Sequence, residues 1–193
     1  MEMGIRFTGF GGQGVILMGI VMARAAALHD QPVGVDGKVK RKSAIQTQSY
    51  GPSARGGHSK CDVKISTEEM HYPFVEIPDF LIVMSRQAYE KYMHDVKPET
   101  KIIIDPDLIP EKPSGHVYRI RATKSAEELG TRVVANVVML GAMREISSIV
   151  SYEALEKAML EIVPKPTYDL NKSALNLGRK LGKEAIHGSE DKD

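Results

Sequence analysis

The stretch Gly9–Gly14 reads Gly-Phe-Gly-Gly-Gln-Gly, and it decides the fold together with the apolar residues on its two sides. Before it, Met3–Phe7 is a short apolar stretch that predicts a strand with Ile5 and Phe7 on one face. After it, Val15–Ala23 is apolar almost all the way round, which is typical of a helix packed beneath a sheet. A strand, a glycine-rich turn and a buried helix in this order predict the Rossmann-like opening of an α/β unit.

The rest of the chain alternates between strand and helix patterns. Further strands are predicted at Asp62–Ser66, Phe80–Met84, Lys101–Asp105 and Val117–Ile120, and further helices from Ser85 to about Val96, from Ser125 to about Ile146, from Ser151, and from Asp169 to about Ile186. Asp36–Lys42 and Gln46–His58 fit neither pattern and are expected to be functional loops or disordered segments. The sequence predicts a single three-layer α/β/α domain over residues 1–187 with a mostly parallel or mixed sheet, and a solvated tail over residues 188–193.

Composition excludes several classes of protein. The chain has 193 residues, of which 42% are hydrophobic and 26% charged, and its formal net charge is +1, so no global field would hold a nucleic acid. The longest apolar stretch, Val15–Ala27, is interrupted by Gly19 and Arg24, and we expect no membrane span. The first residues lack the basic and then apolar segments of a secretory signal, so we expect a cytoplasmic protein.

The single cysteine restricts the chemistry further. Because Cys61 is the only one, this chain by itself forms no disulfide framework, zinc cluster or cysteine-ligated iron–sulfur cluster. It stands in a segment that alternates like a half-buried strand, which favours a small buried hydrophobe over a catalytic thiolate. No two of the six histidines are four residues apart. The sequence therefore predicts neither a metal ligand nor a catalytic residue in this chain.

The glycine turn also matches a nucleotide-binding pattern, Gly9-x-Gly11-x-x-Gly14. Glycines let backbone N–H groups approach an anion, and the positive end of the following helix favours negative charge. Asp36 lies near the position of a ribose-binding acid, so a free-standing NAD(P)-binding protein is one interpretation. The other is a tight turn in which the glycines serve packing alone.

A second glycine-rich stretch, Ser49–Gly57, has the components that a nucleotide-like ligand needs. Tyr50 offers an aromatic face, Arg55 a guanidinium for bidentate phosphate contact, and Gly56 and Gly57 a close backbone approach. The alternative is a surface turn with an incidental arginine.

These residues resemble a known family. Arg6–Val15, Thr47–Pro52 and Arg55–Gly57 at this spacing closely resemble the gamma subunit of 2-oxoacid:ferredoxin oxidoreductases, and the 2-oxoglutarate synthase branch is the most similar. The resemblance continues to the end of the chain through Tyr72-Pro73, Pro78-Asp79, Gln87–Tyr92, Ala135–Ala142 and Asn171–Ala174. Val33–Lys42 departs from the family, because it is longer and more basic than the usual segment.

The resemblance implies a division of labour between subunits. Such enzymes decarboxylate a 2-oxoacid on thiamine diphosphate with Mg²⁺, pass electrons through iron–sulfur clusters to ferredoxin, and release an acyl-CoA, here succinyl-CoA. The chain has no Gly-Asp-Gly…Asn-Asn thiamine motif and too few cysteines for a cluster. Those cofactors would then belong to the alpha and beta (thiamine-binding) and delta (ferredoxin-like) partner subunits, which leaves docking and coenzyme A binding to this chain.

The resemblance also implies a set of residues for coenzyme A. They are Gly9, Gly11, Gly12, Gln13 and Gly14 in the first glycine loop, Tyr50, Gly51, Arg55, Gly56 and Gly57 in the second, and Asn136 on the long helix. Asn136 can instead be a helix-surface residue. The basic run Lys38, Lys40, Arg41, Lys42 is interpreted as a solvated face, with neutralisation of phosphates as the alternative.

Two further points stay open at this stage. Tyr89 and Tyr92, three residues apart on one helix, are interpreted as partner contacts or core. The substrate can also be pyruvate, a branched-chain 2-oxoacid or indolepyruvate, because the substrate contacts would lie mostly on the partner subunits.

Overall fold

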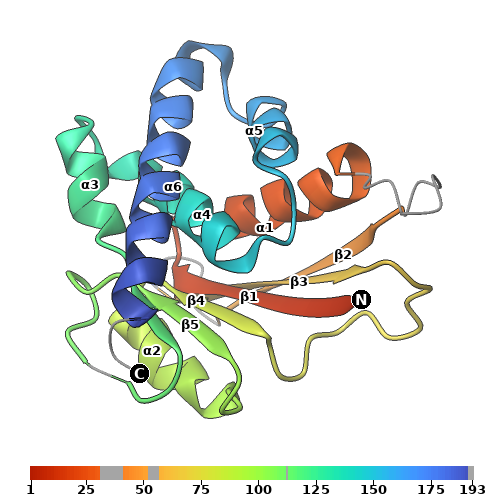
Figure 1. The fold of residues 1–193 in the computed structure, drawn as a ribbon. Coiled ribbons are helices and arrows are strands. Elements are labelled where there is room, and N and C mark those ends of the chain that lie inside the picture. Colours follow the sequence, from red (N-terminus) through yellow and green to blue (C-terminus); the bar gives the residue numbers. More distant parts are fainter. Residues whose placement is uncertain (31–40, 52–56, 112, 191–193) are drawn as a thin grey trace.

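The computed structural model describes residues 1–30, 41–51, 57–111 and 113–190. The strands of these residues form one six-stranded mixed sheet in the order β2-β3-β1-β4-β5-β6 (Figure 1). They are β1 (Glu2–Phe10), β2 (Ser43–Tyr50), β3 (His58–Ser66), β4 (Phe80–Val83), β5 (Lys101–Ile104) and β6 (Val117–Arg119). The pairs β1–β4, β4–β5 and β5–β6 are parallel, whereas β3 runs antiparallel to both β1 and β2.

Helices cover both faces of this sheet. They are α1 (Val15–Arg24), α2 (Arg86–Tyr92), α3 (Ala122–Glu128), α4 (Ala135–Ser147), α5 (Tyr152–Leu160) and α6 (Tyr168–Glu190), and a π-helical turn, Ala25–His29, continues α1. Helices α1, α4, α5 and α6 lie on one side of the sheet and α2 on the other (Figure 1). The α/β/α class with a mixed sheet and a glycine-rich first turn is thereby confirmed.

The apolar core is divided between the two faces of the sheet. Ile82 and Ile103 belong to the layer under α1 and α4, while their neighbours Leu81 and Ile102 belong to the layer under α2. All four are at most 2% exposed, so β4 and β5 are buried on both faces, as their continuous apolar sequence predicts. Each such side chain contributes about 1.5–3 kcal/mol relative to an exposed one.

Glycines allow α6 to pack directly on α4. A Cβ at Gly178 would lie 2.0 Å from the Val138 carbonyl oxygen, and one at Gly141 would lie 2.3 Å from the Leu175 carbonyl oxygen. The helix backbones therefore come closer here than any side chain would permit. As a result, α6 forms an outer layer over α4.

The structure corrects three expectations about local structure. The helix predicted over Ser125–Ile146 is two helices, because Gly130 at φ +100° ends α3 and the Thr131 side chain accepts a hydrogen bond from Val133 N–H. The predicted loop Gln46–His58 begins with the second half of β2, an edge strand whose exposed positions are polar. Helix α6 extends to Glu190, into the segment predicted as a tail.

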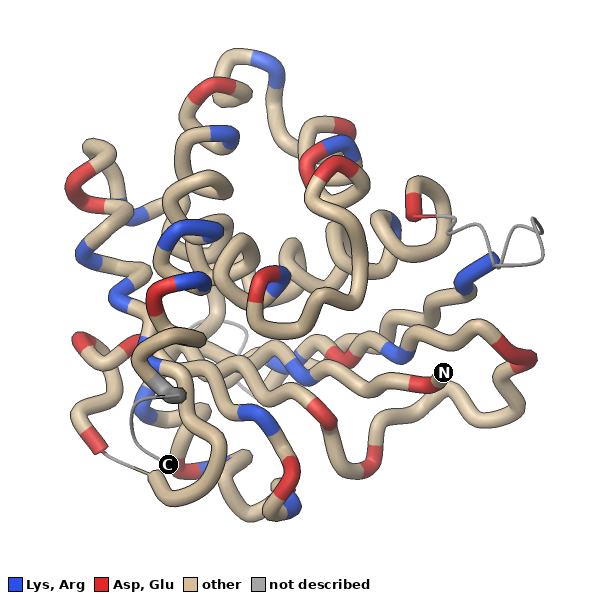
Figure 2. Tube along the Cα trace, viewed as in Figure 1, with Lys and Arg blue, Asp and Glu red and all other residues tan. Residues whose placement is uncertain are grey.

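Other local predictions are confirmed. The hydroxyl of Ser85 accepts from the Ala88 N–H and that of Ser151 from the Ala154 N–H, each at 3.2 Å, and both serines cap their helices. None of the described helices is both long enough and apolar enough to cross a bilayer. Basic and acidic residues are interspersed along the described chain in the view of Figure 2.

Candidate functional site

The first glycine loop, residues 9–14, lies at the carboxyl end of β1. The neighbours of β1 are β3 on one side and β4 on the other, and the chain visits the β3 side before it returns to β4. In open α/β sheets, ligands bind outside the carboxyl ends of the strands at such a switch of direction. The loop therefore stands where this architecture places a ligand.

The conformation of the loop differs from a dinucleotide-binding turn. Helix α1 begins at Val15, after the third glycine, and Gly14 is its N-cap at φ +74° without a capping side chain. In the dinucleotide fingerprint the third glycine instead serves close packing of helix on strand. Here Gly19 has that role, because a Cβ on it would lie 2.1 Å from the Cys61 Sγ. This geometry does not support the interpretation as an NAD(P)-binding protein.

Several N–H groups of the loop and of the first turn of α1 have no acceptor in the part of the chain that the structure describes. Among the described residues, no partner accepts from the N–H groups of Gly12, Gly14, Val15, Ile16 and Leu17. The first intrahelical bond runs from the Met18 N–H to the Gly14 carbonyl oxygen at 3.1 Å. Unsatisfied N–H groups at a helix N-terminus carry partial positive charge and favour a phosphate or carboxylate.

Asn136 reaches this helix end from α4. Its side chain is 5% exposed, so the interpretation as a helix-surface residue is wrong. Its Nδ2 donates to the Gly14 carbonyl oxygen at 3.4 Å, whereas its Oδ1 has no partner among the described residues. A buried, unpartnered amide oxygen is costly, and a donor on a ligand or a water would satisfy it.

The described ends of the second glycine loop, residues 49–51 and Gly57, lie near the first loop. The Gly11 N–H donates to the Gly57 carbonyl oxygen at 3.0 Å, and the Gly51 N–H donates to the His58 carbonyl oxygen at 2.9 Å. Tyr50 is 62% exposed and shares its register partner, Ser59 on β3, with Gly9 on β1. The structure thus brings Tyr50, Gly51 and Gly57 to the first loop, while Arg55 and Gly56 lie outside the described residues.

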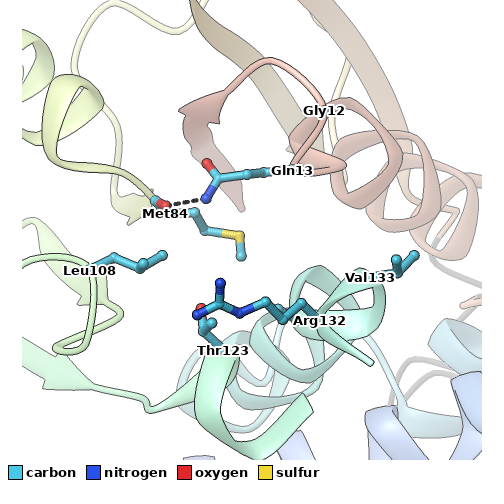
Figure 3. Close-up of a pocket in the computed structure, with 8 residues that line it drawn as sticks. Gly12, Gln13, Met84, Leu108, Thr123, Arg132 and Val133 are labelled. Carbon is cyan, nitrogen blue, oxygen red and sulfur yellow. Dashed lines mark hydrogen bonds between the residues drawn. The ribbon is translucent and has the colours of Figure 1, made fainter. Parts of the chain in front are cut away.

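A cavity of about 340 Å³ opens beside the first loop. It is lined by Gly12, Gln13, Met84, Leu108, Thr123, Arg132, Val133 and Ala135. Figure 3 shows the Met84 and Leu108 side chains pointing into it from one side and the Arg132 guanidinium from another. Val133, at its rim, is 82% exposed.

Six of these lining residues are missed as site residues by the sequence analysis: Met84, Leu108, Thr123, Arg132, Val133 and Ala135. Met84 directly follows β4, and the others lie in turns and helices that follow β5 and β6. The signal that could have identified them is their position just after the carboxyl ends of parallel strands, where open α/β sheets bind ligands. Arg132 pairs with Glu127 and keeps 70% of its side chain exposed, so it offers a cation at the cavity.

The described end of the basic run lies away from both glycine loops. Lys42 Nζ contacts Asp30 Oδ2 at 2.5 Å and donates to the Ile149 carbonyl oxygen at 2.7 Å. It precedes β2, whereas Tyr50 ends that strand, about 25 Å away at the usual rise per residue. Lys42 therefore cannot neutralise a phosphate at the glycine loops. Asp36, Lys38 and Lys40 lie outside the described residues.

The remaining candidates are core residues. Tyr92, the last residue of α2, is 6% exposed, belongs to the apolar cluster between α2 and the sheet, and makes an edge-to-face contact with the His58 ring at 6.0 Å. Tyr89 is partly buried against the same cluster. Cys61 is fully buried, and burial raises the pKa of its thiol to about 11, so it is a small hydrophobe as expected. Within the described part of the chain, no group of three or more His, Cys, Asp or Glu could hold a metal ion.

The fold and the site together define an α/β domain in which the first glycine loop and the N-terminus of α1 lie at the carboxyl end of β1, beside a cavity. Residues 4–181 match the family model described as pyruvate ferredoxin/flavodoxin oxidoreductase, and the chain belongs to this family.

Similar proteins agree with this assignment. The 2-oxoglutarate synthase subunit KorC of Methanocaldococcus jannaschii is 45% identical over 95% of this chain and 96% of its own. The gamma subunit of a keto/oxoacid ferredoxin oxidoreductase from Geobacter sulfurreducens PCA has a crystal structure that superposes with a TM-score of 0.81, at 37% identity over 96% of this chain and 98% of that one.

A third relative is similar in fold. The 2-oxoglutarate:ferredoxin oxidoreductase from Magnetococcus marinus, solved with 2-oxoglutarate, coenzyme A and succinyl-CoA bound, superposes with a TM-score of 0.78 at 22% identity. The match covers 95% of this chain and 31% of that longer chain, so this fold corresponds to one part of the Magnetococcus protein.

Proposed function

We propose that the chain is the gamma subunit of a heteromeric 2-oxoglutarate:ferredoxin oxidoreductase, and that it helps to bind coenzyme A. The choice of substrate rests on the 45% identity to a 2-oxoglutarate synthase subunit over nearly the whole of both chains. The choice of ligand rests on the N–H groups of Gly12, Gly14 and the first turn of α1, for which the described residues supply no acceptor, and on the cavity that Gly12 lines. That helix end is the observation that carries the proposal.

Coenzyme A is a phosphate-rich ligand with a long uncharged arm, and the site offers groups for both parts. Gly12, Gly14 and the first turn of α1 present N–H groups to a phosphate. Arg132 adds a guanidinium at the cavity, where Leu108 and Met84 supply apolar surface. The unpartnered Asn136 Oδ1 would accept from an N–H or O–H of the ligand.

The chain's part in the reaction is then to bind and orient coenzyme A. In the assembled enzyme, alpha, beta and delta partner subunits would hold thiamine diphosphate and iron–sulfur clusters, which would supply decarboxylation and electron transfer to ferredoxin. This chain would hold the acyl acceptor by its phosphates and so reduce the freedom of the thiol that receives the succinyl group.

Replacement of Arg55 tests this proposal in the assembled complex. We expect Arg55→Ala to raise the KM for coenzyme A about ten- to a hundredfold, since a charge-assisted contact contributes roughly 1.5–3 kcal/mol. Arg55→Lys should recover part of the loss, because an ammonium keeps the charge without the planar fork. Arg41→Ala is the control, because Arg41 is exposed just before β2, at the opposite end of the sheet.

Gel filtration beside the kinetics separates ligand binding from assembly. An unchanged KM for coenzyme A in an intact Arg55→Ala complex removes Arg55 from the site. Loss of subunits with normal kinetics in the surviving complex shows instead that Arg55 pairs with a partner subunit.

A further inference from the structure

Gln13 joins the ends of two neighbouring strands. Its side-chain Oε1 accepts from the Phe10 N–H at 2.6 Å, and its Nε2 donates to the Met84 carbonyl oxygen at 2.6 Å. Phe10 is the last residue of β1, and Met84 directly follows β4. Figure 3 shows the hydrogen bond between Gln13 and Met84 as a dashed line. We name these two hydrogen bonds the Gln13 bridge. Each polar end of the amide makes one of these two bonds, so the side chain of Gln13 is anchored at both ends.

The bridge requires both a primary amide and the glycine beside it. An amide donates and accepts at fixed positions, whereas an ionised carboxylate of the same size accepts only. A Cβ at Gly9 would lie 2.7 Å from the Gln13 Oε1 and 2.8 Å from the Val15 Cγ1, so Gly9 makes room for the bridge. Close packing against Gln13 and Val15 therefore explains why residue 9 is a glycine.

The bridge also fixes the part of the loop that faces the cavity. Gln13 stands between Gly12 at φ +100° and Gly14 at φ +74°, two positions with wide conformational freedom. The Gln13 N–H further donates to the Phe10 carbonyl oxygen at 3.1 Å, which closes a tight turn. With Gln13 held at both ends, the N–H groups of Gly12 and Gly14 stay directed by the protein before any ligand arrives.

We propose that Gln13 is a positioning residue for the coenzyme A site: its side chain holds the first glycine loop against β4 and so preorganises the free N–H groups of Gly12, Gly14 and α1. The ligand part of this inference rests on the proposed function. The conformational part rests on the hydrogen bonds of this chain alone. Preorganisation strengthens binding because less conformational freedom is lost when the ligand binds.

The test compares Gln13→Glu and Gln13→Met with the wild-type chain by amide hydrogen exchange. Gln13→Met keeps neither bond of the bridge, and the carboxylate of Gln13→Glu is repelled by the Met84 carbonyl oxygen and so turns out of the bridge. Both variants should therefore speed exchange of the Phe10 N–H about ten- to a hundredfold, while Ile5 and Phe7 in the same strand remain protected. A protonated carboxyl group donates and accepts like the amide, so protection in Gln13→Glu should return as the pH falls below the pKa of the introduced carboxyl group. Gln13→Met should show no such recovery at any pH. The control is Gln87→Glu, the same change at an exposed position of α2.

Kinetics of the assembled complex complete the test. We expect Gln13→Glu to raise the KM for coenzyme A about tenfold with little change in kcat, and Gln87→Glu to change neither. Unchanged Phe10 exchange in both Gln13 variants overturns the proposal, and so does acid recovery in Gln13→Met. A raised KM with unchanged exchange also overturns it, because Gln13 would then contact the ligand directly. If the wild-type complex shows no coenzyme A site on this chain, the proposed function fails, and the exchange data still decide whether the bridge orders the loop.

Discussion

Replacement of Gly14 by alanine measures how tightly the first glycine loop is fitted to α4. Gly14 has φ +74°, and a left-handed backbone costs a residue with a Cβ about 1–2 kcal/mol. The new Cβ would also lie 2.2 Å from the Asn136 Nδ2, so the Asn136 side chain must rotate away from the Gly14 carbonyl oxygen. A buried amide left without its partner costs a further ~1–3 kcal/mol. We therefore expect Gly14→Ala to lower the free energy of unfolding by about 2–5 kcal/mol.

Gly12→Ala is the matched control for this measurement. Gly12 has φ +100°, but a Cβ added there would have nothing within 4 Å, so Gly12→Ala should show the backbone cost alone, about 1–2 kcal/mol. Urea denaturation of the wild-type, Gly14→Ala and Gly12→Ala chains gives the loss in free energy of unfolding for each variant. In an Asn136→Ala background the extra cost of Gly14→Ala should disappear. Equal losses in Gly14→Ala and Gly12→Ala would refute the close fit between Gly14 and Asn136.

Three more predictions follow from contacts elsewhere in the chain. Gly178→Ala should destabilise the chain by about 1–3 kcal/mol in urea denaturation, because its Cβ would meet the Val138 carbonyl oxygen at 2.0 Å; an unchanged midpoint contradicts this. With a thiol pKa of about 11, Cys61 should resist alkylation at pH 8 in the folded chain and react fully in urea; rapid labelling of the folded chain contradicts its burial. Burial acts to raise the pKa of Asp30, but hydrogen bonds from Lys42 and Ser151 outweigh it and hold the pKa below 3.8. The stabilisation by Asp30 is thus present above that pH and lost as the pH falls through the lower folded value, so Asp30→Asn should cost stability at pH 7 and progressively less in acid.

Continuous apolar stretches made much of the fold predictable. β4 and β5 are short segments of consecutive apolar residues. A strand that is buried on both faces needs apolar side chains at successive positions, so this pattern identifies both strands. β2 was not predictable in this way, because an edge strand with one neighbour keeps polar side chains at its exposed positions. The sequence also did not show that the helix is interrupted at Gly130, because the apolar periodicity continues across this residue. Only the positive φ of Gly130 ends α3.

The candidate site was predictable in its loops and not in its details. Glycine spacing located the turn at the end of β1, but it could not show that Gln13 bonds to Met84, which is 71 residues away in the sequence. The cavity residue Arg132 has no local signal, because it enters the site through the packing of α3 and α4. Contacts between residues distant in sequence depend on the tertiary fold, which one sequence pattern does not specify.

Reconstitution of activity from separate subunits tests the central claim most directly. The assay follows viologen dye reduction and succinyl-CoA formation with 2-oxoglutarate and coenzyme A, for this chain alone, for the partner subunits alone, and for the mixture. We predict no turnover by this chain alone and full turnover by the mixture, with a lower KM for coenzyme A than the partner subunits show without it. Turnover by the lone chain, or the same KM for coenzyme A with and without it, would contradict the account.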